Sequence, residues 1–230
     1  MRRAILIFGL LEWLAGAKYA CAQTDLFSTL PQAATSTRAQ TVDGVAARIE
    51  DDILTESELR ELGAFQQLVD GQSKSRIELI QELADQWIIR GEANVAKFPR
   101  PSPETVDKAY ALFLQQFPSP QEFQKRRAAA GLTEASVRRM LEQQLYLFHF
   151  LDYRFRPAAQ VESAQIEAYY RDEFSPQLKA RNQAVPALED VEETIREVLI
   201  QRAISDRATK WLDETRERLK IDVVSQGAGS

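Results

Sequence analysis

The chain has 230 residues and a formal net charge of −5 at pH 7, from 29 basic and 34 acidic residues. This mixed, slightly acidic pattern argues against nucleic acid as a partner, because phosphate backbones are bound through clustered lysine and arginine. The 9 glycines and 9 prolines are few for the length, which favours long helices over a β fold with many turns.

Residues 1–22 are typical of a cleavable secretory signal peptide. Arg2 and Arg3 give it a positive start, residues 4–14 are apolar, and small residues end at Ala22. We expect cleavage after Ala22 and export from the cytoplasm. The apolar run of roughly 10 to 12 residues is shorter than the roughly 20 that a membrane-spanning helix needs, so no transmembrane span is expected.

Cleavage would remove Cys21, the single cysteine of the chain, and leave no disulfide and no thiolate ligand for a metal. Lipidation of Cys21 is the alternative, and the preceding Lys18 and Tyr19 disfavour it. Without residues 1–22 the chain has 26 basic and 33 acidic residues, a net charge of −7.

The rest of the chain is predicted to form one mainly α-helical domain over residues 41–224. Residues 23–40 are rich in Thr, Ser, Ala and Gln without periodicity, and we interpret them as a flexible lead-in; residues 225–230 are interpreted as a flexible tail. The segments 42–49 and 220–224 alternate like short β-strands, and we expect the two strands to pair and close the fold.

Capping residues mark most of the predicted helix starts. Thr55 and Glu58 have the spacing of a capping box, and Gly71 ends that helix. The next helix covers residues 74–95, with Ile77 and Val95 among its inner positions. Later helices are expected to begin at Ser102, at Ser119 (again as a capping box, with Glu122), at Thr133 and at Ser163.

The second half of the domain is predicted to contain two long helices. The first covers residues 134–156; its second half is apolar almost all round, and Asp152 fits its inner line poorly. A short helix through Tyr170 and a turn-rich connection over 174–188 follow. The last helix covers residues 189–219 with one inner stripe.

The sequence carries none of the common catalytic patterns. It has no glycine-rich phosphate loop, no Ser-His-Asp set and no His/Cys ligand spacing, and His149 is the single histidine. Acidic runs at 50–52 and 189–193 precede helices, where negative charge favours the helix dipole. We expect no metal, no cofactor and no enzymatic activity.

Aromatic residues are concentrated between positions 113 and 174. Most are expected to form core, and the remainder are expected to line a groove for apolar segments of another chain, because aromatic side chains give large contact area at low entropic cost. The candidate peptide-binding residues are Phe113, Phe117, Tyr146, Phe150 and Tyr153.

The order of these elements resembles the SurA family of periplasmic chaperones and prolyl isomerases. The resemblance is carried by Val42-Asp43-Gly44-Val45-Ala46-Ala47-Arg48-Ile49, Ile53-Leu54-Thr55-Glu56-Ser57-Glu58-Leu59, Leu79-Ile80-Gln81-Glu82-Leu83, Phe117-Pro118-Ser119 to Phe123, Gly131-Leu132-Thr133, Ile166-Glu167-Ala168-Tyr169-Tyr170 and Lys220-Ile221. It covers roughly residues 41–224. The implied fold is a SurA N-terminal-like helical chaperone domain, onto which the C-terminal helix and strand fold back.

The chain departs from the family where a parvulin isomerase domain would stand. Only 20 residues separate Tyr170 from Val191, and no parvulin-type glycine run or histidine pair is present. The resemblance therefore implies the chaperone module alone: an ATP-independent periplasmic holdase for unfolded exported polypeptides, outer-membrane proteins among them. Two alternatives are a prolyl isomerase that works without the usual domain, and a passive envelope scaffold.

Overall fold

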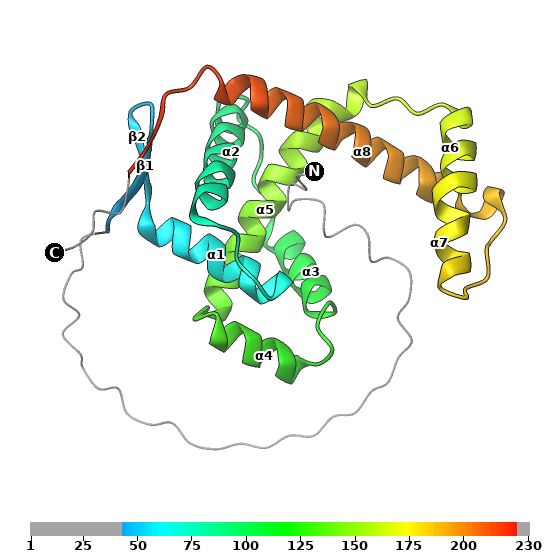
Figure 1. The fold of residues 1–230 in the computed structure, drawn as a ribbon, viewed down its shortest axis with the longest axis horizontal. Coiled ribbons are helices and arrows are strands. Elements are labelled where there is room, and N and C mark those ends of the chain that lie inside the picture. Colours follow the sequence, from blue (N-terminus) through cyan, green and yellow to red (C-terminus); the bar gives the residue numbers. More distant parts are fainter. Residues whose placement is uncertain (1–42, 225–230) are drawn as a thin grey trace.

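A computed structural model describes residues 43–224 of the chain (Figure 1). The expected signal peptide (1–22), lead-in (23–40) and tail (225–230) lie outside the described residues. Within them the chain is mainly helical with one small antiparallel sheet, so the predicted fold class is confirmed. No helix in this part of the chain combines the length and the apolar character needed to cross a membrane.

The sheet joins the two ends of the described chain. Strands β1 (Val45–Ile49), β2 (Asp52–Thr55) and β3 (Ile221–Val223) lie in the order β2-β1-β3, and both pairings are antiparallel. The expected pairing of the two end strands is confirmed. The hairpin partner β2 was not predicted; it turns back at Glu50, which has a φ of 49°. Lys220 donates its backbone N–H to the Glu50 carboxylate at 2.8 Å and so ties β3 to this turn.

Helices α1 (Glu56–Asp70) and α2 (Arg76–Val95) each begin with a capping box. Glu58 donates its N–H to the Thr55 hydroxyl at 3.2 Å, and Thr55 donates its own N–H to the Glu58 carboxylate at 2.9 Å, as predicted. Gly71 ends α1 in the left-handed conformation with a φ of 75°. The prediction that Ile77 and Val95 face inward is wrong, because these side chains are 63% and 84% exposed.

Three helices follow: α3 (Pro103–Leu114), α4 (Pro120–Ala129) and α5 (Glu134–Phe155). Their predicted caps, Ser102, Ser119 and Thr133, each accept a hydrogen bond from the first turn. The capping box predicted at Ser119 is only half formed, since the Glu122 side chain instead accepts a hydrogen bond from Arg126 at 2.8 Å.

The segment after α5 is more helical than predicted. A short 3-10 turn (Arg156–Ala158) leads to α6 (Ser163–Tyr169), a π-helical turn η3 (Tyr170–Phe174), α7 (Ser175–Ala180) and α8 (Leu188–Arg216). The turn-rich connection predicted over 174–188 is wrong up to residue 180, because Pro176 lies in the first turn of α7, where its missing N–H costs nothing. Glu162 rather than Ser163 is the N-cap of α6.

Three hydrophobic clusters form the core. The first lies between the sheet, α1 and α2 and includes Ile49, Leu62 and Ile80. The second joins α1, α3, α4 and the start of α5 through phenylalanine rings. The third joins α2, α5 and the end of α8 and includes Phe150 and Leu212. Of the residues that the structure describes, none between 160 and 200 belongs to these clusters.

This division defines two parts, which we call the body (residues 43–159 and 201–224) and the arm (residues 160–200). The arm consists of α6, η3, α7 and the first half of α8, and Figure 1 shows it projecting from one side of the body. α8 runs across the body and into the arm, where α6 packs against it.

The two halves of α8 bury opposite faces. Ile195 in the arm and Ile204 in the body are both 1% exposed. They are nine positions apart, which at about 100° per residue places them on opposite sides of the helix. The prediction of a single inner stripe for this helix is therefore wrong. One side of α8 packs within the arm, and the opposite side packs against the body.

Candidate functional site

Two of the predicted peptide-binding residues lie in the second core cluster. Phe113 is 2% exposed and Phe117 is 9% exposed. The Phe113 ring stacks on Phe65 at 5.8 Å and contacts Phe117 edge-on at 5.3 Å, and Phe117 contacts Phe123 at 5.1 Å. These rings hold α1, α3 and α4 together, so they do not form a surface for another chain.

Two more lie in the third cluster. Tyr146 is 3% exposed and Phe150 is 1% exposed, and both contact the ring of Phe98. Tyr153 alone reaches the surface, with 63% of the residue exposed beside Phe98. The five predicted residues are therefore divided between two separate cores and one exposed ring, and the groove predicted from them is not present in the described chain.

The partly exposed apolar side chains gather instead on the arm. Its two fully buried aliphatic residues are Ile166 and Ile195, each 1% exposed. Around them the arm has eleven large apolar side chains that remain partly exposed: Val161, Tyr169, Tyr170, Phe174, Leu178, Val185, Leu188, Val191, Val198, Leu199 and Ile200. A lobe with two buried and eleven half-buried apolar side chains has little core of its own and an unusual amount of apolar surface.

Specific contacts hold these rings in place. Tyr170 and Phe174 stack at 5.9 Å across the π-helical turn, and the Tyr170 hydroxyl donates to the carbonyl of Pro186 at 2.7 Å. Arg202 lies over the Tyr169 ring at 4.6 Å and pairs with Glu173 at 2.9 Å. π-helical turns occur frequently at functional sites. The apolar surface of the arm is thus ordered by contacts from the loop before α8 and from α8 itself.

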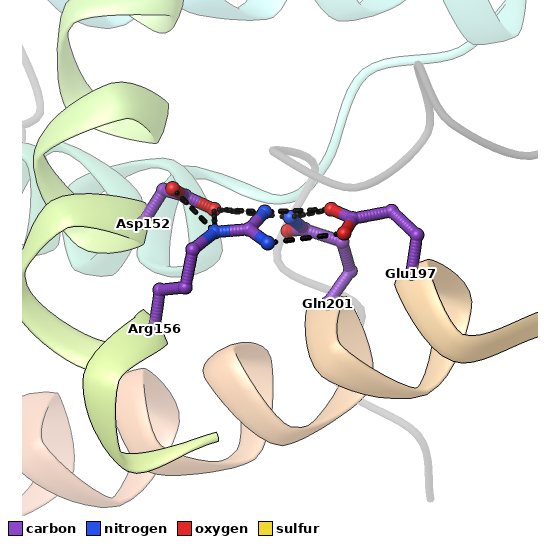
Figure 2. Close-up of polar contacts among 4 residues, drawn as sticks. All are labelled: Asp152, Arg156, Glu197 and Gln201. Atoms are coloured by element: carbon purple, nitrogen blue, oxygen red, sulfur yellow. Dashed lines mark hydrogen bonds and ion pairs between the residues drawn. The ribbon is translucent and has the colours of Figure 1, made fainter. Parts of the chain in front are cut away.

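A polar cluster joins α5 to α8 where the arm meets the body (Figure 2). We call it the Arg156 cluster; it consists of Asp152, Arg156, Glu197 and Gln201. The guanidinium donates to Asp152 at 2.8 to 3.0 Å and to both Glu197 oxygens at 2.6 and 3.0 Å. Gln201, which is 4% exposed, donates to Asp152 at 3.0 Å and to Glu197 at 2.8 Å.

Hydrogen bonds within the Arg156 cluster stabilise the charged form of each ionisable member. Burial on its own would raise the pKa of Asp152, but hydrogen bonds from Arg156 and Gln201 outweigh it and hold the pKa below its ordinary value of 3.8. Hydrogen bonds from Arg156 likewise hold the pKa of Glu197 below 4.5. The hydrogen bonds to Glu197 and then to Asp152 raise the pKa of Arg156. All three groups are therefore charged at neutral pH.

Acidification is expected to weaken this junction. Asp152 and Glu197 have a lower pKa in the folded chain than in the unfolded chain, so their stabilisation is present above about pH 4.5 and is lost as the pH falls through the folded values. Urea unfolding between about pH 6 and about pH 3 should show a smaller loss of stability for Arg156→Met than for the wild type. Identical pH profiles for the two proteins would contradict this role.

The Arg156 cluster was not predicted from the sequence. The available signal was Asp152, a carboxylate on the otherwise apolar inner line of α5, which is only one turn from Arg156. Gln201 gave no signal, because a lone glutamine in a long charged helix is ordinarily exposed.

A cleft lies between α1, α2 and α5. Its lining is mostly polar: Glu58, Glu61, Leu62, Leu83, Gln86, Arg90, Met140, Gln143 and Gln144. Gln143 donates to Gln86 at 2.9 Å within it. A glutamine-rich and charged lining is a poor match for aromatic segments, so the arm is the better candidate for binding apolar chains.

Within residues 43–224 no group of three or more His, Cys, Asp or Glu is placed to hold a metal ion. No protein-family model matches the chain, and no curated protein matches it. The resemblance to the SurA family stays a prediction.

Proposed function

We propose that the chain is an ATP-independent periplasmic holdase chaperone that binds unfolded exported polypeptides, outer-membrane proteins among them, through the apolar surface of the arm. One observation carries the proposal: the arm projects from a body that has its own cores, and its large apolar side chains are mostly half-exposed. The predicted export signal and the sequence resemblance to the SurA chaperone module support the same function.

The arrangement suits weak binding at several points. Apolar side chains of an unfolded chain would cover Tyr170, Phe174 and Leu199 and would be kept from pairing with one another. Affinities near micromolar, about −8 kcal/mol, permit release without an energy source. Because the rings are already ordered by the arm, little conformational entropy is lost when they contact a client.

Aggregation of a denatured outer-membrane protein, followed by light scattering, tests the proposal. Several-fold molar excess of the wild-type chain is expected to suppress scattering. The variant Leu178→Gln/Val191→Gln/Leu199→Gln is expected to lose most of this effect, because it removes three apolar contacts from the arm while keeping good helix formers.

A matched control removes at least as much exposed apolar surface from the body. The variant Ile77→Gln/Val95→Gln/Leu112→Gln changes three exposed side chains, and it is expected to suppress aggregation like the wild type. If the wild-type chain leaves the scattering of the denatured protein unchanged, the proposed function is wrong. A stable oligomer with no affinity for unfolded chains would favour the scaffold alternative instead.

A further inference from the structure

Negative charge is concentrated on the arm. Residues 160–200 include 9 acidic and 4 basic side chains, a net charge of −5. The rest of the described chain has 23 acidic and 21 basic side chains, a net charge of −2. The arm is less than a quarter of the described residues and carries most of their excess negative charge.

Several of these carboxylates are exposed beside the apolar side chains. Glu167 is one helical turn from Tyr170, and Glu192 is one turn from Leu188; side chains at this spacing are neighbours on a helix surface. Glu189 and Asp190 are exposed and lie between Leu188 and Val191 in the chain. Glu167 and Glu192 therefore lie at the edge of the apolar surface, and Glu189, Asp190 and Glu193 add exposed negative charge to the first turns of α8, the helix that carries Leu188 and Val191. We call these five carboxylates the carboxylate rim.

Two of the four basic side chains of the arm are already engaged. Arg171 pairs with the adjacent Asp172 at 2.7 Å, and Arg196 pairs with both Glu192 and Glu193 one turn away. These pairs are local and leave the net charge of the arm unchanged. Arg156 and Arg202 of the body offset two further carboxylates, Glu197 and Glu173, and the remaining excess of carboxylates still gives an approaching chain a negative potential.

We propose that the arm selects apolar and aromatic segments that carry lysine or arginine close to their apolar residues. This inference rests on the proposed function and names the partner chemistry for the same surface. Positive flanks would meet the carboxylate rim while the apolar residues cover the rings, and acidic flanks would be repelled. Because the rim is exposed, the preference would be screened by salt.

Binding of three matched fluorescent peptides tests the inference. The peptides share one aromatic and aliphatic core and differ only in flanks of lysine, serine or glutamate; binding is followed by fluorescence anisotropy. At about 0.02 M salt the lysine-flanked peptide is expected to bind about tenfold more tightly than the serine-flanked one, and the glutamate-flanked one more weakly. At about 0.5 M salt the three affinities should converge.

Variants that neutralise carboxylates test whether the arm is the source of the preference for lysine-flanked peptides. Glu167→Gln/Glu189→Gln/Asp190→Asn/Glu193→Gln is expected to lose the preference for lysine and to keep its affinity for the serine-flanked peptide. The matched variant Asp51→Asn/Asp70→Asn/Glu104→Gln/Asp206→Asn removes four exposed carboxylates from the body, and it is expected to keep the preference.

The outcomes separate this inference from the proposed function. Equal binding of the lysine and serine peptides to the wild type at low salt overturns the inference and leaves the holdase proposal intact. A preference that survives in the arm variant also overturns it. Failure of the wild type to bind any of the three peptides overturns the proposed function itself.

Discussion

Replacing Phe150 by alanine is expected to lower the free energy of unfolding by about 3–5 kcal/mol. The ring is 1% exposed and lies edge-on to Phe98 at 5.6 Å, between α2, α5 and the second half of α8. Removing it leaves a cavity where three helices meet, and the backbone cannot close it without moving one of them. Urea unfolding monitored by circular dichroism measures the loss.

Tyr153→Ala is the matched control, because Tyr153 contacts the same Phe98 ring at 5.3 Å but is 63% exposed. We expect this variant to lose less than about 1 kcal/mol. If Phe150→Ala kept its stability and instead bound clients more weakly, Phe150 would belong to a binding surface, as its sequence pattern first suggested.

Replacing Arg156 by methionine is expected to cost about 1–3 kcal/mol and to loosen the arm. The guanidinium is the one cation of the Arg156 cluster, and its loss leaves the carboxylates of Asp152 and Glu197 facing each other around Gln201 (Figure 2). Like charges at this separation repel, and the junction between α5 and α8 weakens. Hydrogen exchange should rise first in residues 160–200, before the body.

Arg171→Met is the control for the loss of one arginine. Its pair with Asp172 is exposed, at 70% and 58% of the two side chains, and joins adjacent residues rather than two helices. This variant is expected to keep the wild-type exchange pattern and stability. Equal exchange in the arm of the Arg156 variant and the wild type would show that the cluster does not hold the arm.

Helix starts could be predicted because a cap is a local interaction. Thr55, Ser102 and Thr133 each accept a bond from a residue three positions later, and such spacing is visible in the sequence. β2 could not be predicted in this way. Its four residues are held by pairing with β1, and two of them, Asp52 and Ile53, are exposed, so the segment has no strong pattern of its own.

The candidate site was harder to predict than the fold. Periodicity shows which positions of a helix share a face, but it does not show whether another element covers that face. The apolar residues of α5 and those of the arm have similar spacing, yet Phe150 is covered by α2 and α8 while Leu199 stays partly exposed. The two buried faces of α8 could not be predicted for the same reason. A helix that packs against the arm with one face and against the body with the opposite face shows no single apolar stripe in its sequence.

The pairing of β1 with β3 has a consequence for the order in which the fold is completed. β1 leaves the ribosome or a membrane channel first and β3 last, and some 170 positions separate the bonded residues Glu50 and Lys220. Until the end of α8 has emerged, the aromatic side of α5 lacks Ala208 and Leu212, which cover it in the finished chain. A nascent chain of this sequence therefore passes through a long interval in which its own aromatic residues are uncovered, and during that interval it is open to aggregation.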